Sequence, residues 1–466
     1  MASGLHIGLD VGSTRTKAVA HDDVGTVLAV HDTATAWSTS PAGRSETSGA
    51  ALLAGALTAL HGLLARLDED RRVVSIGVTG MAESGVLLDS SGAEAAPVVA
   101  WYDPRGRDEV AALPAAVRDA FTATTGLRAD SQPSAATLAW GRRHGWEVSS
   151  SSTWLSVPEF VVAALGGDRV AEPSLASRTG LFDTVRGVAS DDVADALGLP
   201  RHLLPPPRPA GTSAGTVTAD GVDARLRGAV LTVAGHDHPV AAVGAGAVHP
   251  GHLFNGAGTA DVLLRSVDVR VTPADRARLA AAGVSVGAHV LDGLQAVLGG
   301  VSAGVVLRRV LALTGAAGGG RGEGELRRAL AQAAAPTPRP GPGVRVVAGG
   351  RGGDDVQVVV EREAGPAEVL AAALHHVGEQ ITALLTLVES VVGPHSAAVT
   401  SGGWTGMTCV SALKREVIPR LTFSSVQLPG CRGAAVLGAL AATGAQDQRG
   451  LAALLDVWGA PRPVPA

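Results

Sequence analysis

The stretch that decides the fold is IGLDVGSTRTKAVAHDD, residues 7–23. It contains two runs in which apolar residues alternate with others, separated by the small-residue turn 12–14. Alternation interrupted by such a turn predicts a hairpin of two half-buried strands, and a third strand over 27–30 would extend it to a meander. Asp10 stands at the end of the first strand and Lys17 within the second. The hairpin therefore carries two opposite charges beside a turn of small residues.

Beyond the meander, helical and strand patterns alternate. Residues 48–68 have helical periodicity, and VVSIGVTGM (73–81) is typical of a short buried strand that ends at a glycine. Strands that alternate with helices predict an α/β protein with mostly buried sheets. Further helices are expected at 108–120, 134–144 and 157–165.

A proline-rich break at 199–217 excludes regular structure there. After it the pattern repeats, with a buried strand, a helix and GHLFNGAGTADVLLR (251–265), a second strand–glycine turn–strand. We therefore expect a domain boundary near residue 230. Residues 315–343 are low in complexity and are expected to form a surface excursion. The expected parts are an N-terminal domain over 1–230, a C-terminal domain over 231–445, and a C-terminal helix and tail over 446–466.

Composition limits the class of protein. Of 466 residues, 46% are hydrophobic and 17% charged, and the net charge is −5, which indicates a globular chain without a preference for nucleic acid or acidic membranes. No apolar run is long enough for a membrane span, and no leader is visible, so we expect a cytoplasmic protein. In that compartment Cys409 and Cys431 are expected to be buried, reduced thiols.

The opening hairpin could bind phosphate. Backbone N–H groups and hydroxyls at its turn form a concave donor set suited to phosphate oxygens. Asp10 could hold Mg²⁺ through water, and either Lys17 or Arg15 on the opposite strand face could neutralise phosphate charge. The alternative is an ordinary polar hairpin.

Two downstream segments repeat the use of glycine at strand ends. FNGAGTADVLL (254–264) places glycines and a threonine hydroxyl between two strands, as a second phosphate-binding hairpin would. VTSGGWTGM (399–407) ends a buried strand at two glycines, which would let a flat ring such as adenine approach the backbone. A plain strand-to-helix turn is the alternative for this last segment.

AGHDHPVAAVGAG (234–246) places an aspartate between a buried strand and a helix. A general base is carried at this position in many α/β folds, although Asp237 could instead be a helix N-cap. His236 and His238 flank it, as in a metal site. No third ligand of recognisable spacing follows them, so we do not expect a metal ion on these histidines.

Taken together, eight blocks resemble the FGGY family of carbohydrate kinases, within the actin–hexokinase–heat-shock ATPase superfamily. They occur in family order over nearly the whole chain: GLDVGST, IGVTGM, PVVAWYDPRG, PSLASRTGLFD, GHDHPVAAVGAGAVHPG, GAGTADVLL, SGGW and RGAAVLGALAATGA. The resemblance implies two ribonuclease-H-like domains of the actin-like ATPase type that flank a deep interdomain cleft. It also implies ATP and Mg²⁺ as cofactors and a sugar or polyol as substrate.

The resemblance assigns roles residue by residue. Asp237 would be the catalytic base that deprotonates the substrate hydroxyl, and Asp10 and Asp237 would hold the metal ion. The implied nucleotide-binding residues are Gly12, Ser13, Thr14, Lys17, Gly258, Thr259, Gly402, Gly403 and Trp404. The implied substrate-binding residues are Glu83, Trp101, Asp103, Arg105, Asp237 and His238. For Asp103 and Arg105 the alternative is an ion pair that pins a loop.

The substrate stays open among pentuloses, hexuloses, polyols, cyclitols and deoxy sugars. Glu83 lies where the glycerol kinase branch has a glutamate that binds substrate hydroxyls, whereas His238 replaces the usual glutamine or asparagine. The family's GERTP-like segment is missing, with VVAGGRGGDD (346–355) as its nearest counterpart. A homodimer, common in the family, is possible.

Two rival functions were weighed. A catalytically lapsed kinase fold would only bind nucleotide or sugar, but such a protein need not retain Asp10 and Asp237. GTSAG (211–215) fits the G-x-S-x-G pattern of hydrolases, yet it lacks the strand and helix that a nucleophile elbow requires. No G-x-x-x-x-G-K-[ST] loop is present, which excludes the P-loop kinases.

Overall fold

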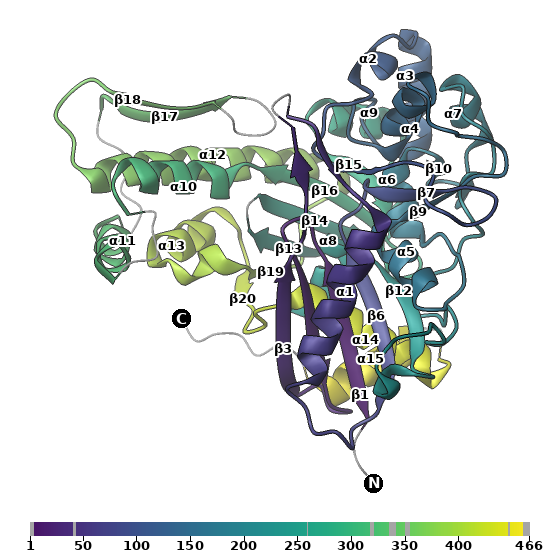
Figure 1. Cartoon of the computed structure of the whole chain (residues 1–466). Coiled ribbons are helices and arrows are strands. Elements are labelled where there is room, and N and C mark those ends of the chain that lie inside the picture. The colour runs from purple at the N-terminus through teal and green to yellow at the C-terminus, as the bar shows by residue number, and fades with distance from the viewer. Residues whose placement is uncertain are drawn as a thin grey trace. The chain divides into compact units, whose positions relative to one another are not determined.

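The chain divides into two compact units. A computed structural model describes residues 4–40, 43–258, 260–316, 321–334, 342–349, 355–445 and 448–459. Unit 1 comprises the described residues up to 248, those of 268–296 and those from 428 onward. Unit 2 comprises the described residues of 249–267 and 297–427. Strands and helices alternate along the chain (Figure 1), so the predicted α/β class is confirmed.

The central sheet of unit 1 has the strand order β12-β6-β1-β2-β3. Its strands are β1 (Leu5–Val11), β2 (Arg15–His21), β3 (Val27–Ala34), β6 (Val73–Gly80) and β12 (Val230–His236). The first three pair antiparallel in sequence order, so the predicted meander is confirmed. β6 and β12 join it as parallel neighbours, and β6 lies between β1 and β12.

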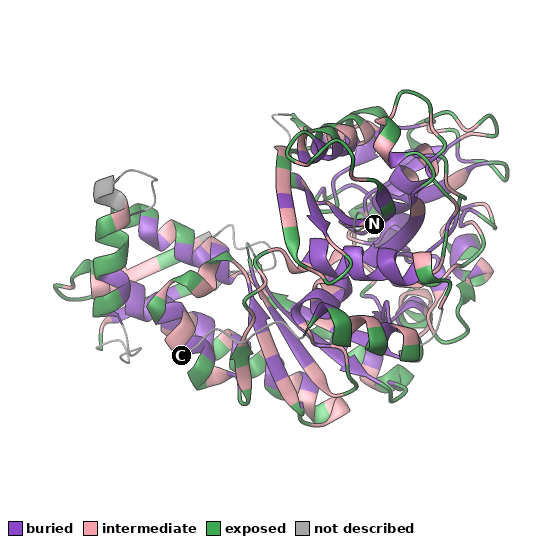
Figure 2. Cartoon of the chain, turned by 90° about the horizontal axis from the view of Figure 1, so that it is seen from below, coloured by how far each residue is buried: buried purple, intermediate pink, exposed green. Residues whose placement is uncertain are grey.

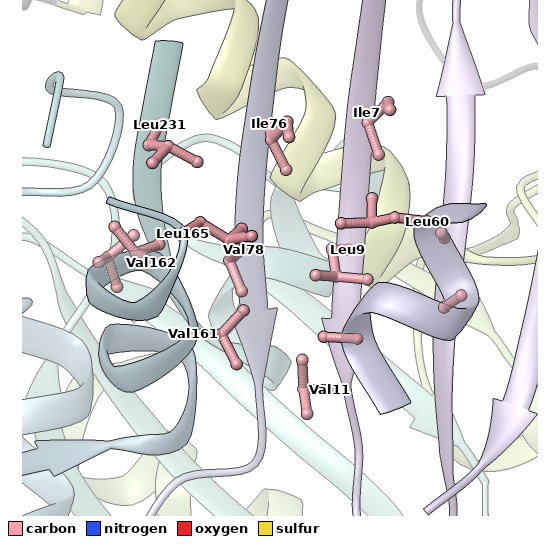
Figure 3. Packing of buried hydrophobic residues seen from close by; sticks show 14 of the residues in the cluster. Ile7, Leu9, Val11, Leu60, Ile76, Val78, Val161, Val162, Leu165 and Leu231 are labelled. Carbon is pink, nitrogen blue, oxygen red and sulfur yellow. The ribbon is translucent and has the colours of Figure 1, made fainter. Parts of the chain in front are cut away.

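The two faces of β1 differ because side chains alternate along a strand. Leu5, Ile7, Leu9 and Val11 are fully buried and belong to one hydrophobic core together with α1 (Gly49–Leu64) and α5 (Val157–Ala164). Figure 3 shows Leu60 of α1, Val161 and Val162 of α5, and Leu165 just after α5, beside the side chains of β1 and β6. Gly8 and Asp10 belong to the opposite face, which is covered by α14 (Pro429–Thr443).

Glycine permits the close approach of α14 to this second face. A Cβ atom on Gly8 would lie 1.8 Å from the carbonyl oxygen of Cys431, and one on Gly77 would lie 1.8 Å from that of Ala434. The same helix packs equally closely on α8 (Asp237–Ala245), since a Cβ on Gly244 would lie 1.9 Å from the Pro429 oxygen. No side chain larger than hydrogen fits at these crossings.

The remaining elements of unit 1 include those that pack around a second hydrophobic cluster, to which Phe121, Leu138 and Trp154 belong. The short strands are β4 (Ser38–Thr39), β5 (Ser45–Thr47), β7 (Gly85–Leu88), β8 (Val98–Val99), β9 (Thr153–Ser156), β10 (Phe182–Asp183), β11 (Val188–Ala189) and β15 (Ser285–Ala288). The helices are α2 (Arg107–Ala111), α3 (Ala115–Thr125), α4 (Ser134–Arg143), α6 (Pro173–Thr179), α7 (Asp191–Ala196), η1 (Ala224–Leu226), α9 (Pro273–Ala281) and α15 (Gln448–Trp458).

Unit 2 contains the strand order β16-β14-β13-β19-β20. Its strands are β13 (His252–Ala257), β14 (Asp261–Val267), β16 (Gln295–Val301), β19 (Ala397–Ser401) and β20 (Leu421–Phe423), with a separate hairpin of β17 (Val344–Gly349) and β18 (Asp355–Val360). Its helices are α10 (Ala303–Leu313), α11 (Arg321–Ala333), α12 (Pro366–Val392), η2 (Gly403–Gly406) and α13 (Thr408–Val417). In each unit the buried residues gather on the strands and on inward helix faces (Figure 2).

The predicted boundary near residue 230 is not where the units separate. β12 follows that residue, yet it pairs with β6 in the sheet of unit 1, and α8 packs on α14 in the same unit. Residues 231–248 therefore belong with unit 1. The last helix, α15, does so too, because the Trp458 ring lies 5.2 Å from the ring of His21.

The expected surface excursion at 315–343 contains helix α11, whose Leu330 and Ala331 are buried in the core of unit 2. Within that stretch, residues 317–320 and 335–341 lie outside the described residues, as do 350–354 of the GERTP counterpart and the tail from 460. Both cysteines are buried and free, as predicted. None of the described helices combines the length and apolarity that crossing a bilayer requires.

Gly8→Ala should destabilise unit 1 because its methyl group would overlap the backbone of α14. Overpacking of this kind costs about 1–3 kcal/mol or more, since a backbone carbonyl cannot rotate away as a side chain can. Gly55→Ala is the matched control: it lies in α1 and its methyl group would meet only the Thr16 hydroxyl at 3.9 Å. Urea unfolding followed by circular dichroism should show a lower midpoint for Gly8→Ala alone, and equal midpoints would contradict the close packing.

Candidate functional site

Asp10 lies at the end of β1, opposite Lys17 on β2. Its Oδ1 atom is buried and has no hydrogen-bond partner. Burial raises the pKa of Asp10 to about 6, against the opposing positive charge of Lys17, and the nearby carboxylate of Asp237 raises this pKa further. Asp10 and Asp237 therefore interact electrostatically across the carboxyl ends of the strands of unit 1.

The turn beyond Asp10 directs its carbonyl groups inward. The Gly12 oxygen accepts a hydrogen bond from the Thr35 hydroxyl at 2.7 Å, and the Ser13 oxygen accepts one from the Trp37 indole at 2.6 Å. The Thr14 oxygen accepts from the Thr35 N–H at 3.0 Å. Among the described residues, none accepts from the N–H groups of Ser13 and Thr14. This turn thus has free donors of the kind that an anion requires.

The two basic residues of this hairpin have different surroundings. Arg15 forms an ion pair with Asp32 on β3. Lys17 instead acts on Asp10, where its charge opposes the rise in the pKa of that carboxyl. Of the two, Lys17 is thus the one directed toward the candidate site.

Asp237 is the first residue of α8, and His236 occupies the N-cap position. Because His236 is the N-cap residue, the alternative that Asp237 is a helix N-cap is wrong. Its Oδ1 atom is buried without a hydrogen-bond partner and lies 3.2 Å from His236 Nε2 and 3.8 Å from His238 Nε2. Burial, together with the charges of His238 and Arg178, lowers the pKa of His236 well below its usual value.

Hydrogen bonds from other elements position the strand end before Asp237. The Thr79 hydroxyl on β6 donates to the Gly235 oxygen at 2.7 Å, and the His236 N–H donates to the Ser174 hydroxyl at 2.9 Å. Gly235 has φ of 113°, and a Cβ there would lie 2.7 Å from the Ser174 hydroxyl oxygen and 2.9 Å from Glu172 Oε2. Only glycine fits in this position.

Ser174 is linked by hydrogen bonds to two buried carboxyl groups, those of Glu172 and Glu159. The Ser174 hydroxyl donates to Glu172 Oε2 at 2.5 Å, and the Glu172 N–H donates to Glu159 Oε1 at 2.7 Å. Burial raises the pKa of Glu172 to about 7 and that of Glu159 to about 8, against the hydrogen bonds that they accept. Buried carboxyl groups therefore underlie the position of the candidate base.

Glu83 is held by an arginine of α6. Arg178 donates to Glu83 Oε1 from Nε at 2.8 Å and from Nη2 at 2.5 Å, and its Nη1 donates to the Ser285 hydroxyl at 2.6 Å. Burial raises the pKa of Glu83, whereas Arg178 lowers it, and the charges of Asp237 and His238 also act on it. Glu83 has φ of 62°, a strained conformation that tends to occur at functional sites.

The WYDPR loop separates into a buried pair and exposed rings. Arg105 donates to both oxygens of Asp103, at 2.9 and 2.8 Å, and the Ser45 N–H donates to Asp103 at 2.9 Å. Since both charged side chains are buried and mutually paired, this geometry favours the loop-pinning alternative. Trp101 and Tyr102 are 40% and 49% exposed, so Trp101 is the residue of this loop that a ligand could contact.

In unit 2 the second glycine hairpin joins β13 and β14. The Gly258 N–H donates to the oxygens of Gly256 and Ala260, each at 3.1 Å, which closes the turn. Gly402 has φ of 129°, and a Cβ there would lie 2.3 Å from the Ala257 oxygen, so the end of β19 and this hairpin are in contact. Thr259 lies outside the described residues.

Beyond Gly402 the backbone is accessible. A Cβ on Gly403 would meet no atom within 4 Å, which leaves room for a flat group beside it. Trp404, in contrast, is partly buried and packs on the hydrophobic core of unit 2. The Trp404 ring therefore contributes to the hydrophobic core of unit 2, and only its exposed part is accessible to a ligand.

A buried polar network anchors the same hairpin. Lys414 of α13 forms an ion pair with Asp261, the first residue of β14, and both side chains are almost fully buried. Asn255 donates from its side chain to Asp261, and its own oxygen accepts from the Thr400 hydroxyl at 2.9 Å. Four elements of unit 2 are thus tied together next to the glycine turn.

Sequence reasoning assigned no role to Arg178, Glu172 or Lys414. Arg178 is the one charged residue of its helix and is buried, and a buried arginine needs a partner. Lys414 was visible as one of only two lysines in the chain. Composition alone could therefore have marked it, but its partner Asp261 is far away in the sequence.

Comparison with known proteins identifies the family. The profile of the FGGY family of carbohydrate kinases, N-terminal domain, matches residues 5–244, more than half of the chain. The chain belongs to the FGGY family of carbohydrate kinases. A glycerol kinase of Cereibacter sphaeroides is 28% identical over 283 residues, which cover 59% of this chain and 56% of the relative. The chain thus spans little more than half the length of the curated relatives it matches.

Solved structures of FGGY kinases share the fold. Xylulose kinase from Rhodospirillum rubrum aligns with a TM-score of 0.81 and 25% identity, over 99% of this chain and 93% of that one. Plasmodium falciparum glycerol kinase with ADP aligns with a TM-score of 0.84 and 16% identity, over 99% and 93% of the two chains. The actin-like ATPase fold implied by the sequence blocks is thereby confirmed.

Lys414→Met should destabilise unit 2, because it leaves the Asp261 carboxylate buried without its cation. Removing one partner of a buried ion pair costs about 3–5 kcal/mol. Hydrogen exchange of the backbone amides of β13 and β14 should therefore become faster. The double variant Lys414→Met/Asp261→Asn no longer buries an unpaired carboxylate, so it should recover part of the protection against exchange. The control is Glu361→Gln, which removes the exposed pair with Arg345 in the same unit and should change little.

Stability should fall as pH rises through neutrality, because the folded-state pKa of Glu172 is raised to about 7. The folded chain keeps this proton at a pH where the unfolded chain has lost it, so the stabilisation is complete below the unfolded pKa of about 4.5 and is lost as pH rises through about 7. Glu172→Gln cannot ionise and should show a smaller fall in thermal midpoint between pH 5 and 9. Exposed Glu69→Gln should follow the wild type, and parallel curves for all three would refute the assignment.

Proposed function

We propose that the chain is an ATP- and Mg²⁺-dependent kinase that phosphorylates a hydroxyl group of a small sugar or polyol. The main support is a pair of carboxylates, Asp10 at the end of β1 and Asp237 at the start of α8, both in unit 1. Each has a buried Oδ1 atom without a hydrogen-bond partner, and each acts electrostatically on the other. A buried carboxylate oxygen without a protein partner is free to bind a ligand.

In this proposal Asp237 is the general base. Its carboxylate accepts the proton of the substrate hydroxyl as that oxygen attacks the terminal phosphorus of ATP. The position of Asp237 at the start of α8 fits this role, because its backbone is fixed by Thr79 and Ser174 while its Oδ1 is left free of hydrogen bonds. The base is therefore held in place by its neighbours without being neutralised by them.

Mg²⁺ fits the same two carboxylates. The ion prefers oxygen ligands and usually keeps several waters, so both carboxylates could hold it through water, which leaves Asp237 Oδ1 free to accept the proton. When bound, it would offset the charge of the phosphate groups. Lys17 would add a second positive charge on the side of Asp10, and the free N–H groups of Ser13 and Thr14, beyond Gly12, would bind phosphate oxygens.

The substrate end is assigned to Glu83, His238 and Trp101. Glu83 accepts two bonds from Arg178 on a single oxygen, Oε1, so Oε2 can accept from substrate hydroxyls. Trp101 offers an exposed ring on which a sugar or polyol carbon chain could pack. Asp103 and Arg105 act indirectly in this proposal, by holding the loop that carries Trp101.

Nucleotide binding in unit 2 is assigned to its two glycine segments. Gly258 and Thr259 belong to the turn that Lys414 and Asp261 anchor, and they would contact phosphate. Gly402 and Gly403 would border the adenosine, because the backbone beside Gly403 is open. Trp404 is assigned to the same border with its partly buried ring.

Asp237→Asn should reduce phosphorylation by at least about 10²–10⁴-fold, the usual contribution of a general base, while nucleotide affinity changes little. The assay is ADP release with Mg²⁺ over a panel of glycerol, other polyols, cyclitols, pentuloses, hexuloses and deoxy sugars, with products identified by mass spectrometry. Asp195→Asn, which breaks a surface ion pair with Arg201, is the control and should retain full activity.

Two results would refute the proposal. Near-normal turnover in Asp237→Asn would remove this residue from its role as base. Tight binding of ATP in calorimetry, together with no acceptor-dependent ADP release across the panel, would instead identify a lapsed kinase fold that only binds its ligands.

A further inference from the structure

His236, Asp237 and His238 form a compact cluster at the junction of β12 and α8. Each offers one ligand atom, and these three atoms lie within 4.8 Å of one another. No third ligand of recognisable spacing follows the two histidines in the sequence, but the structure supplies one from the residue between them. We propose that this cluster is a binding site for a transition-metal dication such as Zn²⁺ or Co²⁺, and that the bound ion blocks the carboxylate of Asp237.

The distances in the cluster fit a metal ion. Ligands at about 2.0–2.1 Å from a tetrahedral Zn²⁺ lie roughly 3.4 Å from each other. Asp237 Oδ1 lies 3.2 Å from His236 Nε2 and 3.8 Å from His238 Nε2, so one distance is slightly shorter and the other slightly longer than this ligand–ligand separation. The two imidazole rings meet edge to face, with centroids 5.2 Å apart, so small side-chain rotations would complete the geometry.

The local backbone explains how three consecutive residues can converge. His236 ends a strand in the extended conformation, whereas Asp237 and His238 begin a helix, so the chain changes direction between the two histidines. Because Ser174 accepts the His236 N–H and Thr79 donates to Gly235, this bend is held by other elements. A site on a fixed bend loses little conformational freedom when the ion binds.

The donor set selects a different cation from Mg²⁺. Two imidazole nitrogens and one carboxylate oxygen suit Zn²⁺, Co²⁺, Ni²⁺ and Cu²⁺, whereas Mg²⁺ prefers oxygen ligands alone. Three protein ligands also leave one coordination position open for water. The cluster is therefore distinct in chemistry from the Mg²⁺ site proposed for Asp10 and Asp237, although both would use Asp237.

The surrounding charges permit a dication. Asp10, Glu83 and Asp237 are acidic, and they face two basic residues, Lys17 and Arg178. His238 and Arg178 both act electrostatically on His236, and Arg178 is engaged in two hydrogen bonds to Glu83. Asp237 Oδ1 makes no hydrogen bond that an incoming ion would have to displace.

Inhibition follows if Asp237 is the catalytic base, so this consequence depends on the proposed function, whereas metal binding itself does not. A dication on Oδ1 lowers the basicity of the carboxylate and occupies the space that a substrate hydroxyl must enter. Phosphorylation should then fall as the cluster fills, even with Mg²⁺ and ATP in excess.

The test is a titration of the full chain, freed of metal by a chelator, with Co²⁺ in the presence of excess Mg²⁺. One equivalent should produce the visible absorption of four-coordinate Co²⁺, and Zn²⁺ should displace it. His238→Gln, which removes one ligand from a partly exposed position, should weaken Co²⁺ binding at least about tenfold. The matched control is His249→Gln. The ring centroids of His249 and His252 lie 5.0 Å apart, so His249 also has a histidine neighbour, but it does not belong to this cluster.

The outcomes separate the metal site from the kinase. Equal Co²⁺ affinity in His238→Gln and His249→Gln, or a spectrum without four-coordinate features, would overturn the site. If one equivalent of Zn²⁺ binds and ADP release continues at its full rate, the blocking of Asp237 is refuted. A chain that binds Co²⁺ as expected yet never phosphorylates an acceptor would leave the site standing and refute the proposed function instead.

Discussion

The close packing of α14 against β1, β6 and α8 is the constraint on which unit 1 depends. Gly8 and Gly77 let the helix backbone touch the sheet, and Gly244 lets it touch α8. One helix from near the C-terminus thereby fixes both the strand that ends at Asp10 and the helix that begins at Asp237. It also approaches the site directly, because a Cβ on Gly430 would lie 3.1 Å from Asp10 Oδ2.

Charge burial explains why so many acidic groups in unit 1 have perturbed pKa values. Burial raises the pKa of Asp10, Glu83, Glu159 and Glu172, and this effect is offset only in part, by the charge of Lys17 for Asp10, by Arg178 for Glu83 and by accepted hydrogen bonds for the other two. A fold selected for stability alone would replace such groups by apolar residues. Their concentration around the start of α8 is typical of a site where chemistry requires charged groups that water does not fully solvate.

Local sequence patterns predicted the strands and helices well. The domain boundary and the partners of buried charged residues depend on long-range pairing, which local patterns do not reveal. The hairpin around residues 12–14 follows from alternation and a turn, so sequence was sufficient there. β12 pairs with β6 across more than a hundred intervening residues, and no local signal reveals this, so the boundary at 230 was misplaced. The partners of Arg178 and Lys414 were missed for the same reason, since Glu83 and Asp261 are close to them only in the folded chain.

The same pairing has a consequence for the chemistry. Because β12 belongs to the sheet of β1 and β6, the candidate base, Asp10 and Glu83 all lie in unit 1 and share one hydrogen-bonded frame. The positions of Asp10 and Asp237 therefore depend on backbone pairing and on the packing of α14, whereas Glu83 lies in the bend that follows β6 and is held by two hydrogen bonds from Arg178. A substrate hydroxyl bound by Glu83 would meet Asp237 at a distance set by this frame, which is the preorganisation that general-base catalysis requires.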